Sequence, residues 1–404
     1  MDWSINLNAL ALTYSCAFLG PFGGNIVIAM FPTLEAWFNV DVSSMALSIT
    51  LFMLPFCTMY IFGGSLSDAY GRGRVLSLGL LIYGVGSLTA AFSPNIAAFL
   101  ASRAIQGCGA GIMSPTAMAL LGDIVPSKSL GRAMGGYSVA VTAGMAFGTL
   151  MGGAFAAFNW ASAFIVMCLA ALALALISLK MPSRGRADRG VTVAWRGFIQ
   201  AMRNRVVFLA GIIGFIAFIV RVGVITYAAD ALGKPPYQMS PENIGILISI
   251  SGFIGLIAGP ASGYLSDRMG RFQTALIGVA ALIATSATLA LPQWAQLMPL
   301  IMVLLGFGGT TIFTPLGAES LDALPAARGA ASSVFGFLRF LGYALGPMIL
   351  LYPYTTCYVQ GVAVVSLAAT LAAAALIINY TRSQKDKPPE TEYMVEIKAG
   401  GRRG

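Results

Sequence analysis

The sequence predicts an all-α polytopic membrane protein with twelve transmembrane helices, built as two parallel six-helix pseudo-repeats. Composition is the first reason: 57% of the 404 residues are hydrophobic, 10% are charged and the mean hydropathy is +0.81, whereas soluble proteins carry about 25% charged residues. Second, the charges cluster and leave apolar stretches of about 20 residues, each long enough to cross the hydrocarbon core as a helix. Third, the chain repeats a polar loop after 199 residues.

Twelve apolar stretches are expected to span the membrane, and most loops between them are short. The expected spans lie near residues 8–31, 44–64, 75–92, 96–121, 133–156, 160–179, 206–229, 243–265, 274–292, 297–318, 330–351 and 357–380. The longer basic segment 181–205 is predicted to link an N-terminal bundle (1–180) to a C-terminal bundle (206–381). Within it, residues 191–202 are predicted to form an amphipathic helix on the membrane surface. The polar residues 382–404 are predicted to be a disordered tail.

The repeat is marked by two polar loops, residues 64–74 (GSLSDAYGRGR) and residues 263–271 (GYLSDRMGR). The pairs that match at an offset of 199 are Gly64/Gly263, Leu66/Leu265, Ser67/Ser266, Asp68/Asp267, Gly71/Gly270 and Arg72/Arg271, and later Gly107/Gly306, Gly109/Gly308, Asp123/Asp322 and Pro126/Pro325. Because each half has an even number of spans, both halves enter the membrane in the same orientation. The halves are therefore parallel repeats, related by an axis along the membrane normal.

The positive charges indicate how the chain lies across the membrane. With the N-terminus inside, the loops on that side hold 20 of the 24 Lys and Arg residues, and the outer loops hold only Lys234. Since Lys and Arg concentrate in cytoplasmic loops, we expect a multi-pass cell-membrane protein with both termini cytoplasmic. The net charge of +9 then reflects topology, and no nucleic-acid partner is expected. The sequence has no histidine, so we expect no metal site, no cofactor and no enzyme activity.

The two polar loops resemble the motif between helices two and three of the major facilitator superfamily, a family of transporters with parallel halves. Arg103, Gln106, Gly107 and Gly109 look like its helix-four motif. The residues that match the spacing of the helix-five motif of its drug–proton antiporters are Gly135, Gly144, Gly148, Gly152 and Gly153, although Gly148-Thr149 stands where that motif has Gly-Pro. The resemblance implies efflux of small, drug-like organic molecules driven by proton entry, through a monomer in the lipid bilayer whose substrate binds between the halves.

Gating residues are expected in the two polar loops. Gly64, Gly71 and Gly270 permit close approach of the backbone or a sharp turn. Asp68 and Asp267 are carboxylates that can meet the positive N-terminus of a helix in the opposite half when the cytoplasmic side is shut. Arg72 and Arg271 are expected to add a second tie. The helix-five glycines, which mostly share one face, are expected to line the moving boundary between halves.

Three arginines, Arg103, Arg221 and Arg339, lie inside expected spans, where each costs about 2.5–3.5 kcal/mol on insertion scales. Arg103, with Gln106, is a candidate for proton coupling or for bonding the carbonyls of the first span. By contrast, no Asp or Glu lies deep in a span, and arginine does not give up its proton. The coupling ion therefore stays open. An alternative hypothesis is a transporter or exchanger of anionic metabolites, with Arg221 and Arg339 as clamps for carboxylate or phosphate groups.

Overall fold

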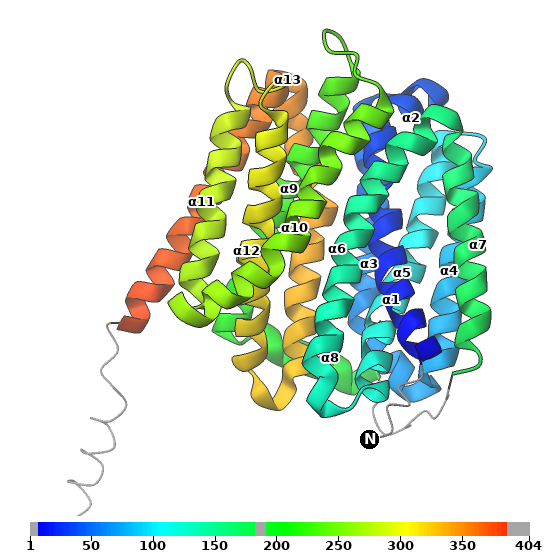
Figure 1. Ribbon diagram of the computed structural model, residues 1–404, viewed down its shortest axis with the longest axis vertical. Helices are drawn as coiled ribbons and strands as arrows, with labels where there is room; N and C mark the ends of the chain where they lie inside the picture. Colours follow the sequence, from blue (N-terminus) through cyan, green and yellow to red (C-terminus); the bar gives the residue numbers. More distant parts are fainter. Residues whose placement is uncertain (1–6, 182–190, 386–404) are drawn as a thin grey trace, which may run out of the picture.

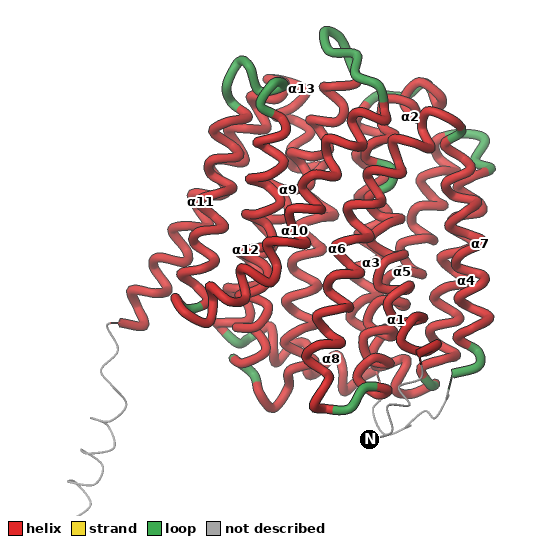
Figure 2. Tube along the Cα trace, in the orientation of Figure 1, coloured by secondary structure: helices red, strands yellow, loops and turns green. Residues whose placement is uncertain are grey.

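The computed structural model describes residues 7–181 and 191–385, and helices account for nearly all of them (Figures 1 and 2). The N-terminal half contains α1 (Leu7–Asn25), η1 (Ile28–Met30), α2 (Phe31–Phe38), α3 (Val42–Tyr70), α4 (Arg72–Ala91), α5 (Ile96–Ile124), α6 (Ser127–Phe158) and α7 (Trp160–Ser178). After α8 (Val191–Met202), the C-terminal half contains α9 (Arg205–Gly233), α10 (Pro241–Met269), α11 (Arg271–Leu289), α12 (Met298–Asp322), η2 (Pro325–Ala327) and α13 (Arg328–Lys385).

The predicted twelve spans are confirmed. Eleven helical segments are long and apolar enough to cross a membrane, and one of them, Arg328–Ser383, is a hairpin of two spans. The backbone leaves the helical region at Cys357 and Tyr358 inside α13. Figure 1 shows the chain rising to this point in orange and returning in red. The last span continues to Lys385, beyond the expected end at residue 381, and residues 386–404 of the predicted tail lie outside the described residues.

The N-terminal part of the chain departs from the expected boundaries. The first span was expected to run to residue 31, but α1 ends at Asn25 and the chain then forms η1 and the short helix α2. Pro32 lies in the first turn of α2, a position that tolerates proline, and Asn39 ends the helix in the left-handed conformation with φ of 52°. The helix α2, where a loop was expected, places acidic Glu35 inside the protein.

The predicted repeat is visible in three dimensions, because equivalent glycines meet equivalent backbone atoms. A Cβ added at Gly107 would lie 2.0 Å from the carbonyl oxygen of Phe52, and one at Gly306 would lie 2.2 Å from that of Ser251, the residue 199 positions after Phe52. Such close approach leaves no room for a side chain. The glycines therefore fix the same packing of α5 on α3 and of α12 on α10.

The predicted amphipathic helix is present as α8, and it packs on the bundle. Trp195 stacks on Phe62 of α3 with ring centroids 6.1 Å apart, and Phe198 meets Phe337 of α13 at 5.6 Å. Phe198 is buried. Since α3 and α13 belong to different halves, α8 bridges the two halves at the end where the polar loops lie.

Candidate functional site

The two ends of the bundle differ in how the halves meet. We call the end with the loops around Gly71 and Gly270 the motif end, and the end with Glu35 and Lys234 the far end. Boundary contacts between the halves run along α6 and α10 on one side and along α3 and α13 on the other. Which end is open follows from these contacts.

The far end is closed. The ammonium Nζ of Lys234 lies 2.9 Å from Oε2 of Glu35 in the other half. The Tyr343 hydroxyl donates a hydrogen bond of 2.9 Å to Oδ1 of Asn25, and the Thr50 hydroxyl donates one of 2.6 Å to the carbonyl oxygen of Ala344. All three contacts join residues of different halves. The far end is therefore sealed by polar ties.

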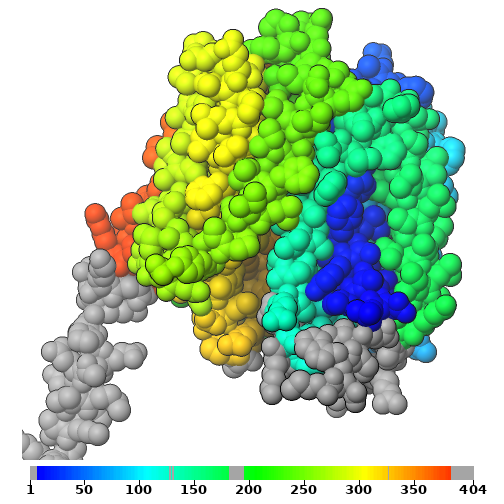
Figure 3. Space-filling model, viewed as in Figure 1, coloured from blue at the N-terminus to red at the C-terminus, as the bar shows by residue number. Residues whose placement is uncertain are grey.

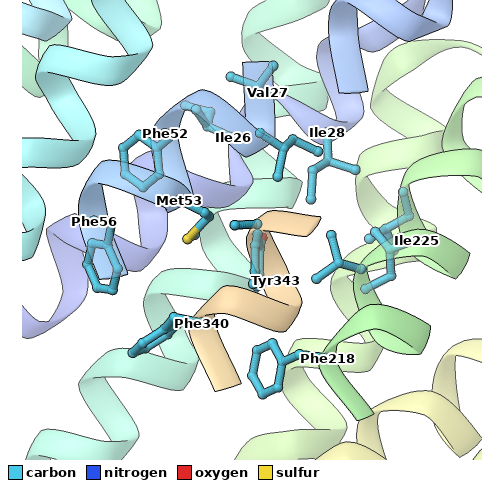
Figure 4. Close-up of a cluster of buried hydrophobic side chains, with 14 of the residues drawn as sticks. Ile26, Val27, Ile28, Phe52, Met53, Phe56, Phe218, Ile225, Phe340 and Tyr343 are labelled. Carbon is cyan, nitrogen blue, oxygen red and sulfur yellow. The ribbon is translucent and has the colours of Figure 1, made fainter. Parts of the chain in front are cut away.

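A hydrophobic cluster backs these polar ties (Figure 4). Phe56 of α3 and Phe340 of α13 pack edge to face, with ring centroids 4.8 Å apart. Phe218 of α9 lies 5.9 Å from Tyr343. Figure 4 shows these side chains pointing toward one another, with Ile28 and Ile225 beside them. Because both halves contribute, separating the far end would expose this buried apolar surface.

The motif end is open on the side of α6 and α10. A Cβ added at Gly135 of α6 or Gly263 of α10 would meet nothing within 4 Å. By contrast, one at Gly252, nearer the far end of α10, would lie 2.5 Å from the Cβ of Ala146 on α6. Figure 3 shows the corresponding hollow between the two halves in the lower part of the molecule. The structure is thus a conformation open toward the motif end.

In this open state the ion pairs of each polar loop lie within its own half of the protein. Gly71 and Gly270 have φ of 95° and 92° and make the predicted sharp turns between helices. Arg72 pairs with Asp68 at 2.5 Å and with Asp123 at 2.8 Å. These partners belong to the same half, so the expected ties across the halves are not made here.

The second loop repeats this arrangement only in part. Arg271 pairs with Asp322 at 2.5 Å, as Arg72 pairs with Asp123, and also with Glu319 at 3.2 Å. Asp267 is exposed. Gly64 has open space around it, so the expected close approach is not made at this position in the structure. The latch on a helix N-terminus thus stays a prediction about the state in which the motif end is shut.

The helix-five glycines divide between two partners. A Cβ at Gly144, Gly148 or Gly152 would lie within 2.7 Å of a carbonyl oxygen of Phe18, Phe22 or Ile26, respectively. These three glycines therefore pack within the N-terminal half. Gly153 faces the other half, where the same Cβ would lie 2.3 Å from the carbonyl oxygen of Pro241. The expectation that the whole set lines the boundary between halves is corrected. Gly153 lies at this boundary, whereas a Cβ at Gly135 would meet nothing within 4 Å.

Arg103 and Gln106 form a buried network within the N-terminal half. Arg103 has no exposed surface. Its guanidinium donates a hydrogen bond of 3.0 Å to the carbonyl oxygen of Gly23 and another to Oε1 of Gln106, and it lies 4.3 Å from the centre of the Phe52 ring. Gln106 in turn donates a hydrogen bond of 2.8 Å to the Ser87 hydroxyl. Two roles were expected for Arg103, proton coupling and bonding to carbonyls of the first span. The structure shows the second, a hydrogen bond to a carbonyl of α1.

Arg339 is enclosed by aromatic rings. Its guanidinium carbon lies 3.7 Å from the centroid of Phe313 and 4.2 Å from that of Phe340. Tyr60 of the other half packs against Phe340, with ring centroids 5.6 Å apart. Rings in this position stabilise a cation through their π faces, so the site holds a partly buried positive charge between the two halves.

Arg221 lies on α9 one turn after Phe218, whose ring centroid is 5.8 Å from the guanidinium carbon of Arg339. A Cβ at Gly309 would lie 3.4 Å from the Arg221 guanidinium. In the described part of the chain no ion pair includes Arg103, Arg221 or Arg339. The ion pairs that are formed there use other basic residues, and their acidic members are Glu35, Asp68, Asp123, Asp230, Glu319 and Asp322. Two cations without an acidic partner can receive an anionic group, and the rings around Arg339 suit an aromatic one.

Sequence reasoning missed an acidic cluster at the far end. Asp230, expected near the end of a span, has no exposed surface, and Glu35 is 8% exposed. Asp230 pairs with Lys234 at 2.7 Å and accepts a hydrogen bond of 2.5 Å from the Tyr354 hydroxyl. Burial lowers the pKa of Lys234, but the hydrogen bonds and charges of Asp230 and Glu35 outweigh it, so this pKa lies above its ordinary value. The i,i+4 spacing of Asp230 and Lys234 was the available signal.

Comparison with known proteins identifies this architecture. The sequence model of the Major Facilitator Superfamily matches residues 13–347. The chain belongs to the major facilitator superfamily. It is therefore a multi-pass membrane transporter, as the twelve spans and the internal repeat indicate, and the superfamily consists of transporters and not enzymes. The predicted resemblance and fold class are confirmed.

Several characterised members of the superfamily are similar to this chain. It is 25% identical to the riboflavin transporter RibZ of Clostridioides difficile (strain 630), over 81% of this chain and 84% of that protein. It is 27% identical to the bacillibactin exporter of Bacillus subtilis (strain 168), over 85% and 88%. Its fold matches an inward-facing bacterial homologue of the human lysosomal transporter Spinster, with a TM-score of 0.74 and 18% identity, covering 96% of this chain and 100% of that one.

Proposed function

We propose that this superfamily member exports small organic molecules by alternating access, and that proton entry drives it. It resides in the cell membrane with both termini in the cytoplasm, so the motif end is the cytoplasmic end. The observation that carries the proposal is a site between the halves around Arg339, with the far end sealed and the motif end open. Such a state accepts substrate from the cytoplasm. The bacillibactin exporter is a relative whose name states export.

The substrate class follows from the side chains at this site. Aromatic rings around Arg339 favour a planar or aromatic substrate. Two arginines without an acidic partner disfavour a cationic one, because like charges would meet in a low dielectric. We therefore expect neutral or anionic aromatic molecules to bind. Riboflavin, named in one relative, is an aromatic probe of this kind.

Riboflavin efflux from proteoliposomes tests the proposal. With a pH gradient imposed in the direction of proton entry, riboflavin should move against its concentration gradient, and collapse of the pH gradient should abolish that movement. Ethidium, a planar cation, serves as the matched probe and is expected to move more slowly. Efflux that ignores the pH gradient would refute the proton-driven part.

Exchange of anionic metabolites is the second candidate, and the pair Arg221 and Arg339 favours it. Here the arginines clamp a carboxylate or phosphate group. Binding of a panel of aromatic carboxylates to Arg221→Ala and Arg339→Ala, with the exposed Arg328→Ala as control, decides between the two. Anions that bind the first two variants as tightly as the parent would exclude the clamp.

A further inference from the structure

The far end contains a cluster in which two acidic side chains share one lysine across the boundary between halves. Lys234 lies 2.9 Å from Oε2 of Glu35 and 2.7 Å from Oδ1 of Asp230. Glu35 belongs to α2 in the N-terminal half, whereas Asp230 and Lys234 belong to the C-terminal half. Tyr354 adds its hydrogen bond to Asp230. Opening the far end must therefore separate Glu35 from the other three groups.

The charges of this cluster do not balance. Two ionised carboxylates and one ammonium carry a net charge of −1. Asp230 is fully buried and Glu35 is 8% exposed, and a buried uncompensated charge is strongly unfavourable. When two carboxylates share such a site, one of them tends to keep its proton. A single proton would make the closed cluster neutral.

The hydrogen bonds show the same deficit. Oε1 of Glu35 is buried and has no hydrogen-bond partner among the described residues. The carboxyl groups of Glu35 and Asp230 lie against the same ammonium, at 2.9 and 2.7 Å, and two ionised carboxylates can only accept hydrogen bonds. A proton on either one supplies the missing donor.

The remaining titratable groups near the cluster do not replace this proton. Tyr354 is stacked between Tyr227, at 4.5 Å, and Tyr358, at 5.3 Å, and tyrosines are neutral at physiological pH. On the side of α3, Asp41 is exposed and accepts hydrogen bonds from Ser43 and Ser44. The imbalance therefore stays with Glu35, Asp230 and Lys234.

We propose that Glu35 and Asp230 together bind one proton when the far end closes. This rests on the alternating access of the proposed function and names the group that senses the gradient. In the open state water surrounds both carboxylates and Glu35 is ionised. Closure then takes a proton from the solution at the far end, so low pH on that side favours the closed state. With one proton linked, the ratio of closed to open molecules changes by up to about tenfold per pH unit.

Distances between spin labels at the far end test this in liposomes without substrate. The labels sit at the exposed, equivalent positions Phe92 and Leu291, each replaced by cysteine after the five native cysteines are changed to alanine. In the parent, short distances should gain population as the pH falls from 9 to 5. In Glu35→Gln and in Asp230→Asn the cluster is neutral without a proton, so the distribution should become independent of pH.

Two further variants keep the test decisive. Glu242→Gln removes another carboxylate of the far end, one that forms no ion pair in the described part of the chain, and should behave as the parent. Lys234→Gln leaves the carboxylates without a cation, so the pH at which the end opens should rise. Parent-like pH dependence in Glu35→Gln would overturn the proposal.

Failure of the proton site and failure of the proposed function give different results. Riboflavin efflux by the parent that keeps its pH dependence in Glu35→Gln removes the proton site and leaves export standing. Parent protein that moves no organic molecule, while its far-end distances still follow pH through Glu35, removes export and leaves the proton site.

Discussion

Gly153 packs so closely on α10 that adding one methyl group, in Gly153→Ala, should destabilise the closed state of the far end. In Gly153→Ala the new Cβ would lie 2.3 Å from the carbonyl oxygen of Pro241 and 3.1 Å from the Cα of Glu242. These are backbone atoms of the other half, so they cannot turn away as a flexible side chain does. An ordinary contact begins near 3.4 Å, so the helices must separate by about 1 Å. Overpacking of this kind costs about 1–3 kcal/mol.

That cost applies to the closed far end and not to the open one. The ratio of closed to open molecules should therefore fall by about 5- to 150-fold, since about 1.4 kcal/mol is a factor of ten. Gly135→Ala is the matched control, because it lies on the same helix α6 and its Cβ meets nothing within 4 Å. Both changes raise helix propensity equally, so the difference between them reports the contact alone.

Far-end distances between labels at Phe92 and Leu291 measure this ratio. Gly153→Ala should lengthen them, and Gly135→Ala should leave them as in the parent. Identical distributions for the two variants would refute the conclusion that Gly153 seals the far end. Because both variants retain the polar ties of Lys234, a change can be assigned to the helix contact.

Three further predictions concern other parts of the bundle. Gly107→Ala places a Cβ 2.0 Å from the Phe52 carbonyl oxygen, whereas Gly122→Ala on the same helix meets nothing within 4 Å. The midpoint of thermal unfolding should therefore be lower for Gly107→Ala, by the equivalent of about 1–3 kcal/mol, and equal midpoints would contradict the packing described. Trp195→Ala removes the stacking of α8 on Phe62, worth about 0.5–1.5 kcal/mol, so labels at Tyr70 and Met269 should move apart at the motif end, in contrast to the exposed Gln200→Ala. Asp68→Asn should fold as the parent, because Arg72 keeps Asp123 at 2.8 Å, yet riboflavin efflux should slow, and full efflux would reduce this aspartate to a role in topology.

Much of the fold could be predicted from the sequence because membrane insertion imposes simple rules. Apolar length defines the spans, and the 199-residue offset of Gly107 and Gly306 defines the repeat, since each glycine meets a backbone atom that is itself repeated. The hairpin at Cys357 was predicted from the apolar pattern even though the helix on either side is nearly continuous. Such features depend on local composition and on spacing along the chain.

The site could be predicted only in part because its contacts join distant segments. Arg339 was identified from its position in a span. The aromatic rings around it come from α9, α12 and α13, and hydropathy does not predict that these three helices meet. Glu35 was assigned to a loop because α2 follows a break after Asn25 that composition does not indicate. The helix-five glycines were identified by spacing, yet only the packed structure shows that Gly152 faces the turn at Ile26, after α1, and that Gly153 faces α10.

The central claim is that the two ends of the bundle open alternately around one site. Label pairs at Tyr70 and Met269 for the motif end, and at Phe92 and Leu291 for the far end, measure this directly in liposomes during riboflavin efflux. The structure predicts a resting state with short far-end and long motif-end distances, and a fraction in which both are reversed during transport. Efflux that proceeds while both distributions stay unchanged would contradict alternating access.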